Sequence, residues 1–183
     1  KGATKKPWEG NGPMETPWNL ISASPIPFNE NFATPKEMTL EDMEEIKAQF
    51  VQATKNADEA GFDMIELQTH HGFLLASFLS PLTNIRTDEF GGSIENRLKY
   101  PLEVFNSIRE VFPAEKPISV RISATDWTEN GISEQEVITI ATAFKNAGAD
   151  IINVSTGNTV AGQKPLTGRM WQTPFSDAVR NTV

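Results

Sequence analysis

The sequence predicts an α/β fold in which parallel strands alternate with helices, as in part of a (β/α)8 TIM barrel. Short, continuously apolar segments alternate with amphipathic helical patterns, which is typical of parallel sheets. The segments AGFDMIEL and AGADIINV are similar and indicate a repeated βα unit. The chain has 183 residues, whereas a complete barrel typically needs about 250. We therefore expect a partial barrel.

A flavodoxin-like sheet is the alternative fold with the same alternation of strands and helices. That fold is disfavoured because no glycine-rich phosphate-binding turn follows the first predicted strand. Neither GxGxxG nor GxxxxGK[ST] occurs anywhere in the chain.

Residues 1–38 are rich in Pro, Gly, Asn and Trp and show no sustained period, so we expect a long loop at the rim of a larger scaffold. Its aromatic residues Trp8, Trp18 and Phe28 either line a pocket or fill gaps in the surface. Residues 39–183 are predicted to form three βα units, and the chain is treated as one segment of a single barrel domain.

The first half of those units begins at Thr39, a predicted helix N-cap with acidic residues in the turn that follows. Gly61 is expected to end this helix, and the apolar segment Phe62–Leu67 is predicted to be the first strand. A long loop follows. Ser93 then caps a second helix, which Pro101 is expected to kink or split.

The second half has clearer boundaries. Ile118–Ser123 is predicted to be the second strand. Ser133 begins a capping box that opens a third helix, which runs through Asn146. Ile151–Ser155 is the third predicted strand, and a glycine-containing loop leads from it to a last helical start near Pro174.

Composition excludes several classes of protein. The net charge of −8 disfavours nucleic-acid and anionic-membrane partners. The absence of cysteine excludes disulfides and thiolate chemistry, and with two histidines we expect no metal site. No apolar run is long enough to cross a membrane, and the N-terminus lacks the apolar core of a signal peptide. We expect a cytoplasmic protein and, without an initiator methionine, a piece of a longer chain.

The candidate site lies just past the first strand, because parallel α/β folds place their chemistry at the carboxyl ends of strands. Gln68, His70 and His71 occupy that position. Adjacent residues of an extended chain point in opposite directions, so one histidine is expected to face the barrel mouth and the other the surrounding wall. The alternative is that both are hydrogen-bonded structural histidines.

Arg121 is the second candidate, because a charge inside an apolar strand is costly to bury unless it is paired. Its partner is either an anionic ligand or Glu66 of the preceding strand, and the two possibilities are compatible. The charged residues between Asn84 and Arg97 are interpreted as an ion-paired loop that caps the following helix.

Five blocks of the chain stand out: GFDMIEL, HGFLLASFLSPLTNIRTDEFGGSIENR, VRISATDW, GADIINVSTG and QTPF. Together they resemble the old yellow enzyme family of FMN-dependent NAD(P)H oxidoreductases, over essentially the whole chain. Within it they are most similar to the oxidoreductase half of salicylyl-CoA 5-hydroxylase and anthraniloyl-CoA monooxygenase proteins. The resemblance implies a (β/α)8 barrel with FMN at its mouth, of which this chain supplies strands four to six.

The resemblance also implies roles for individual residues. Arg121 matches the arginine that contacts the flavin N1/O2 region. His71 matches the second member of the pair that anchors a substrate carbonyl, and Gln68 matches the first member, which is normally histidine. Phe73 stands where many relatives have a tyrosine that donates a proton, so the proton chemistry of this member is expected to differ.

The function implied is that of an FMN-dependent NAD(P)H oxidoreductase that passes hydride through flavin to an unsaturated carbonyl or CoA-thioester substrate. The family's flavin-phosphate site lies largely on the last two strands, so we expect the isolated chain not to retain FMN. The alternative is a non-catalytic barrel fragment that self-associates through open sheet edges, as a homo-oligomer. An aldolase-type barrel is disfavoured because no strand ends in lysine.

Overall fold

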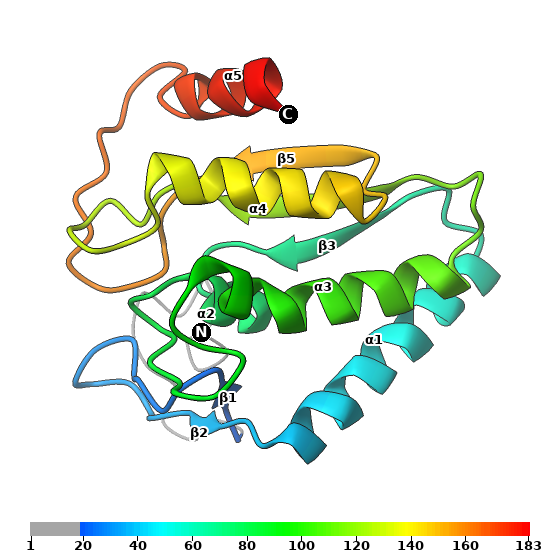
Figure 1. The fold of residues 1–183 in the computed structure, drawn as a ribbon, viewed down its shortest axis with the longest axis horizontal. Coiled ribbons are helices and arrows are strands. Elements are labelled where there is room, and N and C mark those ends of the chain that lie inside the picture. Colours follow the sequence, from blue (N-terminus) through cyan, green and yellow to red (C-terminus); the bar gives the residue numbers. More distant parts are fainter. Residues whose placement is uncertain (1–18) are drawn as a thin grey trace, which may run out of the picture.

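The computed structural model describes residues 19–183, in which a three-stranded parallel sheet packs against a layer of helices (Figure 1). The predicted alternation of parallel strands and helices is confirmed. The strands, in sheet order, are β3 (Ile65–Thr69), β4 (Ile118–Ser123) and β5 (Ile151–Ser155). The helices are α1 (Leu40–Glu59), α2 (Leu74–Leu79), α3 (Ile94–Val111), α4 (Glu134–Asn146) and α5 (Thr173–Thr182).

The helix starts follow from side-chain caps, as the sequence predicts. Thr39 accepts a hydrogen bond from the backbone of Asp42, whose carboxylate accepts one in return, and this capping box begins α1. Ser133 and Glu136 make the same arrangement at the start of α4. Each box satisfies backbone N–H groups that have no partner inside the helix.

Three expectations about the first half need correction. The first strand spans Ile65–Thr69 and not Phe62–Leu67, because pairing with β4 begins only at Ile65; Phe62 is exposed. The short buried helix α2 lies inside the segment expected to be a loop. Finally, of the two effects expected of Pro101, a kink or a split, the split does not occur: α3 is continuous and Pro101 is buried in its middle. There, burial of the apolar side of α3 outweighs the one backbone hydrogen bond that proline cannot make.

The N-terminal segment is more ordered than a loop where the structure describes it. Two-residue strands, β1 (Ile21–Ser22) and β2 (Lys36–Glu37), pair in parallel. Between them Phe28 meets Phe32 edge to face, with ring centroids 5.4 Å apart, and both rings line a cavity that reaches Gly72 after β3. Trp8 and Trp18, which were grouped with Phe28 in the sequence, lie outside the described residues.

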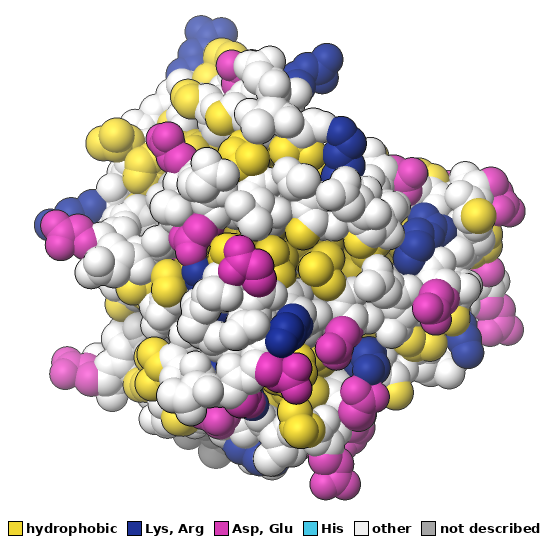
Figure 2. All heavy atoms as spheres, viewed as in Figure 1, with side chains coloured by type: hydrophobic (Ala, Val, Ile, Leu, Met, Phe, Trp, Pro, Cys, Tyr) yellow, Lys and Arg dark blue, Asp and Glu magenta, His cyan; other side chains and the backbone are white. Residues whose placement is uncertain are grey.

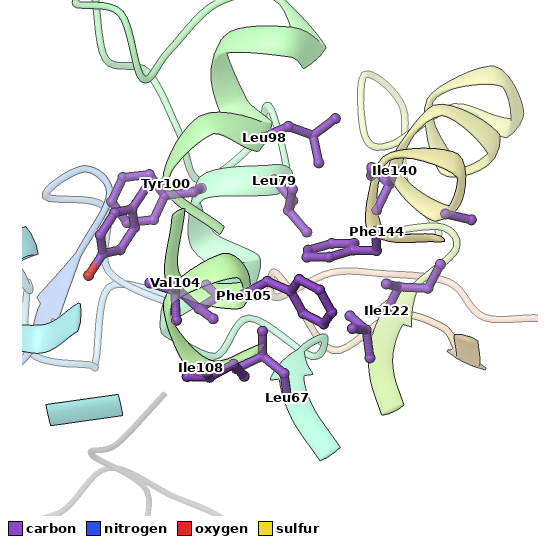
Figure 3. Packing of buried hydrophobic residues seen from close by; sticks show 14 of the residues in the cluster. Leu67, Leu79, Leu98, Tyr100, Val104, Phe105, Ile108, Ile122, Ile140 and Phe144 are labelled. Carbon is purple, nitrogen blue, oxygen red and sulfur yellow. The ribbon is translucent and has the colours of Figure 1, made fainter. Parts of the chain in front are cut away.

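The main core lies between the sheet and helices α3 and α4 (Figure 3). Leu67 of β3 and Ile122 of β4 meet Phe105 of α3 and Phe144 of α4, and the two phenylalanine rings pack edge to face at 5.6 Å. This packing anchors the strands whose carboxyl ends carry the candidate site. No helix among residues 19–183 is long and apolar enough to cross a membrane.

Acidic and basic side chains are interspersed on the face of the molecule shown in Figure 2, with no continuous basic patch. This distribution, together with the net charge of −8, offers no surface suited to a nucleic-acid backbone on that face.

Candidate functional site at the carboxyl ends of three strands

Strand register places three polar side chains in one row across the sheet. Gln68 of β3 pairs with Arg121 of β4, which in turn pairs with Asn153 of β5. Because side chains alternate between the faces of a strand, all three lie on the face opposite the core, which would be the interior of a complete barrel. The arginine thus stands between two neutral amides.

Arg121 has no carboxylate partner among the described residues, and its Nε atom is buried there without a hydrogen-bond acceptor. The predicted ion pair with Glu66 is not formed. Glu66, two residues before Gln68 on β3, has other partners: its Oε2 accepts hydrogen bonds from Ser119 Oγ at 2.9 Å and Asn153 Nδ2 at 2.8 Å. An unpaired cation on a partly buried polar face suits a ligand that brings negative charge or carbonyl oxygens.

His71, which follows β3, is held by the ends of the other two strands, β4 and β5. Its backbone N–H donates to Ser123 Oγ at 2.9 Å, and its Nε2 lies 2.7 Å from Ser155 Oγ. The register pairs these two serines, so they form adjacent points on one sheet edge. His71 is half-buried at this edge, and its expected place at the barrel mouth stays a prediction.

The expected opposition of the two histidines is wrong. The rings of His70 and His71 lie against each other in a tilted arrangement, with centroids 3.9 Å apart and planes at 39°. The reason is that His71 has φ of 54°, in the left-handed region, so the chain leaves the extended conformation that makes neighbours alternate. His70 is buried, at 3% exposure.

The tight turn continues through Gly72 and delivers Phe73 to the surface. Gly72 has φ of 68°, and a Cβ there would lie 3.1 Å from the carbonyl oxygen of Thr159. Phe73, the N-cap residue of α2, is 46% exposed and its ring lies 5.7 Å from that of His70. A phenyl ring has no proton to donate, so position 73 supplies contact area and no acid.

The loops after β4 and β5 are joined by hydrogen bonds. Gly157 donates its N–H to the carbonyl of Thr125 at 2.7 Å, and its own carbonyl accepts from Ser123 Oγ at 3.3 Å. Asp126 is completely buried, and its Oδ2 accepts from Ser80 Oγ and from the backbone of Ile132. These bonds fix the strand ends in position.

Sequence reasoning missed Ser123, Ser155 and Asp126. The two serines end their strands in equivalent places, at the last residue of ISVRIS and of IINVS. That coincidence was a usable signal, since equivalent positions of parallel strands meet at one edge. It also missed an aromatic cluster: Trp127 stacks on Trp171 at 5.8 Å and meets Phe175 edge to face at 5.5 Å.

Metal chemistry has no support in the described part of the chain, where no three His, Cys, Asp or Glu side chains are grouped to hold an ion. The available groups are instead one fixed cation, a neutral amide, an imidazole and several hydroxyls. Such a set can bind and polarise an oxygen-rich, planar ligand.

Comparison with known proteins identifies the family and the fold. The model of the NADH:flavin oxidoreductase / NADH oxidase family matches residues 8–181. The NADPH dehydrogenase of Geobacillus thermodenitrificans is 40% identical over 166 residues, which are 91% of this chain and 48% of that protein. The NADPH dehydrogenase of Bacillus velezensis is 44% identical over 163 residues, 88% of this chain and 47% of that protein. The chain spans about half the length of these curated relatives.

Solved structures give the same answer for the fold. A 2-naphthoyl-CoA reductase in complex with 2-naphthoyl-CoA matches 91% of this chain with a TM-score of 0.79 and 26% identity, over 26% of its own length. Histamine dehydrogenase from Rhizobium sp. 4-9 matches 90% of the chain with a TM-score of 0.76 and 28% identity, over 25% of its length. Morphinone reductase in complex with tetrahydroNAD, at 22% identity and a TM-score of 0.71, shares the fold; the match covers 90% of this chain and 47% of that one.

Proposed function

The chain belongs to the NADH:flavin oxidoreductase / NADH oxidase family, and from this membership we propose that it forms the middle of an FMN-dependent enzyme that oxidises NADH or NADPH. The resemblance noted from its sequence blocks is confirmed. The proposed acceptor is an unsaturated carbonyl compound or a CoA thioester. The observation that carries the proposal is the row Gln68–Arg121–Asn153, in which the arginine has no ion-pair partner among residues 19–183 on the face that would line the barrel.

The residues present fit a flavin. When bound, FMN supplies the ring that accepts hydride and passes it on. Arg121 offers a fixed guanidinium to the part of that ring where negative charge develops on reduction, and a fixed cation there favours the reduced form. Its buried Nε also lacks an acceptor among the described residues, and a carbonyl oxygen at the ring edge would provide one.

Gln68 and His71 are proposed to hold the acceptor by its carbonyl oxygen. Gln68 is exposed on the inner face and can donate through its amide, although it cannot titrate. His71 is fixed from both sides by serines. Donation of hydrogen bonds to the carbonyl draws electron density from the conjugated double bond and prepares it for hydride.

The proton that completes the reduction would not come from position 73, since Phe73 carries none. We propose that it comes from solvent at the open mouth of the site. The CoA-thioester alternative is supported by the match to a reductase whose structure holds 2-naphthoyl-CoA. We also propose a cytoplasmic location, where NADH and NADPH are turned over.

The proposal is tested in the full-length protein by Arg121→Met, with Arg180→Met as the control of equal charge change on the exposed side of α5. We expect the Arg121 variant to bind FMN at least tenfold more weakly, measured by quenching of flavin fluorescence, because the loss of one charged hydrogen-bond donor is worth about 1.5–3 kcal/mol. Unchanged affinity for FMN in Arg121→Met would contradict the assigned contact.

A second test addresses the acceptor. With flavin bound, His71→Ala should raise KM for 2-cyclohexen-1-one and lower kcat, whereas the rate at which NADPH reduces the flavin should change little. Equal kinetics in His71→Ala and the unsubstituted protein would remove the anchoring role.

The second candidate function is association without catalysis. In residues 19–183, β3 and β5 each have an unpaired edge, and Met64 and Ile151 near the amino ends of these strands are both 45% exposed. Unpaired strand edges bind other strands. Sedimentation of the purified protein decides: a colourless oligomer that does not take up FMN supports this candidate, and a yellow protein that binds FMN supports the enzyme.

A further inference from the structure

The hydroxyl of Ser155 lies against the imidazole of His71 at the centre of the candidate site. We propose that Ser155 is a positioning residue that sets the tautomer of His71: its hydroxyl donates to Nε2, so that the neutral imidazole carries its proton on Nδ1. The assignment of this proton rests on the contact between Ser155 Oγ and His71 Nε2. Its consequence for catalysis rests on the function proposed above.

The geometry of the contact is that of a strong hydrogen bond. Ser155 Oγ and His71 Nε2 are 2.7 Å apart, within the range of O–H hydrogen bonds in proteins. Ser155 is the last residue of β5 and is 1% exposed. Its carbonyl accepts a hydrogen bond from Ala124 at 2.8 Å, so the main chain that carries the hydroxyl is also fixed.

The direction of the hydrogen bond follows from the proton of the hydroxyl. No second partner of Ser155 Oγ exists among the described residues, and no other acceptor there takes the hydroxyl hydrogen. If Nε2–H donated to Oγ, the hydroxyl hydrogen of Ser155 would be left buried without an acceptor, which costs free energy. Donation from Oγ–H to Nε2 satisfies both atoms, and it requires an unprotonated Nε2.

Ser123 differs from Ser155 although the two occupy paired positions. Its hydroxyl accepts from the backbone N–H of His71 and donates to the carbonyl of Gly157, so both of its capacities are used on main-chain groups. Ser123 therefore fixes where His71 sits, including its left-handed backbone, while Ser155 fixes which ring nitrogen carries the proton. Two serines at one register level divide these two tasks.

The tautomer matters for the proposed reduction because His71 must donate to a carbonyl oxygen. A proton on Nδ1 makes that nitrogen the donor and leaves Nε2 as the acceptor held by Ser155. Without Ser155, a neutral imidazole exchanges between its two tautomers, and the donor is present for only part of the time. Ser155 thus acts on substrate through His71 and does not itself touch substrate.

The test is to read the imidazole nitrogens directly by two-dimensional NMR of protein labelled with 15N-histidine, without flavin, at about pH 8, where an ordinary histidine is neutral. The sequence contains two histidines, and a His70→Gln variant assigns the signals. We expect His71 Nδ1 at the shift of a protonated nitrogen and Nε2 at that of an unprotonated one. The reverse pattern in the unsubstituted protein overturns the proposal.

Variants then locate the cause. Ser155→Ala should move His71 toward a mixture of tautomers, and Ser155→Thr, which keeps a hydroxyl, should restore the Nδ1–H pattern. The matched control is Thr156→Ala: Thr156 is equally buried and adjacent, but its hydroxyl accepts from Gln172 and does not reach His71. An unchanged His71 spectrum in Ser155→Ala also overturns the proposal, and the spectrum of the unsubstituted protein tests it even if that variant does not fold.

Kinetics separate this inference from the proposed function. In the flavin-loaded full-length protein, Ser155→Ala should raise KM for 2-cyclohexen-1-one by at least about twofold, because an equal mixture of tautomers leaves half of the His71 rings with their donor, with flavin reduction by NADPH unchanged. If Ser155→Ala changes the tautomer of His71 but not the kinetics, Ser155 still sets the tautomer. The proposal that His71 holds the substrate carbonyl would then be wrong.

Discussion

The two faces of the β3–β4–β5 sheet are made by alternate residues of the same strands, yet their chemistry is different. The face toward the helices is apolar and closed, with Leu67, Val120 and Ile122 all buried. The opposite face carries Glu66, Ser119, Arg121, Gln68 and Asn153 in two levels. Strands of continuous hydrophobicity are expected where both faces are covered, and the polar face departs from that pattern, which supports the proposal that it binds a ligand.

Two arginines show what the difference means. Arg97 of α3, on the helical side, is 3% exposed and donates to the carbonyls of Gly92 and Leu79 and to the carboxylate of Glu136. Arg121, on the other face, has a buried Nε without a partner in the described chain. The first arginine is satisfied by the fold itself, whereas the Nε of the second has no acceptor among residues 19–183, which is why we propose a ligand as its partner.

The largest effect expected from this comparison is on folding stability. Phe105→Ala should lower the free energy of unfolding by about 3–5 kcal/mol, because a completely buried ring between α3 and α4 is replaced by a cavity. Gln68→Ala, on the polar face, should change it by no more than about 0.5 kcal/mol. Urea denaturation of both variants measures the two values. Similar losses would show that the polar face is also part of the core.

The two arginines give the next prediction. Arg97→Met should cost about 3–5 kcal/mol, since it leaves a partly buried carboxylate and two carbonyls without their cation. Arg121→Met should leave the stability of the flavin-free protein unchanged or slightly raised, because Arg121 has no ion-pair partner to lose within residues 19–183 and a partly buried charge is removed. Thermal unfolding compares them directly. A large loss in Arg121→Met would mean that the arginine serves the fold.

The helical side was largely predictable from the sequence, because it depends on local signals. Caps at Thr39 and Ser133, the apolar runs at Ile118–Ser123 and Ile151–Ser155, and the parallel order all follow from patterns a few residues long. The sequence-based predictions were wrong where tertiary contacts determine the bounds or the presence of an element. The start of β3 is set by pairing with β4, and helix α2, six residues long, is stabilised by burial of nearly its whole surface.

The site was predictable only in part. Arg121, Gln68 and His71 were identified from an unusual charge in a strand, from position after a strand and from family blocks. The serine pair was not, because a hydroxyl in a strand has no distinctive pattern until register places Ser123 beside Ser155. The contact between the rings of His70 and His71 depends on a single left-handed residue, which sequence periodicity does not reveal.

A smaller effect is expected at the cap of α4, which belongs to the closed side of the comparison. Ser133→Ala should lower the free energy of unfolding by about 1 kcal/mol, because the backbone N–H of Glu136 loses its acceptor. Ser133→Asn, which keeps an acceptor at the same place, should restore most of this stability. Urea denaturation resolves the difference. Equal stability of all three proteins would show that the capping hydrogen bond adds nothing to the packing of α4.

The smallest expected effect concerns a charge on the exposed rim of the helical layer, at Asp42. Hydrogen bonds from Lys36 and then from Thr39 lower the pKa of its carboxyl group from 3.8 to about 2. Since the folded pKa lies below the unfolded one, Asp42 contributes its stability above pH 3.8 and loses it as the pH falls toward about 2. NMR titration of the carboxyl signal measures this pKa.

Lys36→Met should move the pKa of Asp42 back toward 3.8, because it removes the largest cause of the shift. Lys47→Met is the matched control: Lys47 has the same charge but pairs with Glu44 on the exposed side of α1, so the pKa of Asp42 should stay at about 2. If both lysine variants raise it equally, the shift comes from the general field of α1 and not from the contact with Lys36. In that case, either lysine on the exposed rim would have the same effect on Asp42. Arg97, inside the helical layer, instead depends on its particular partners.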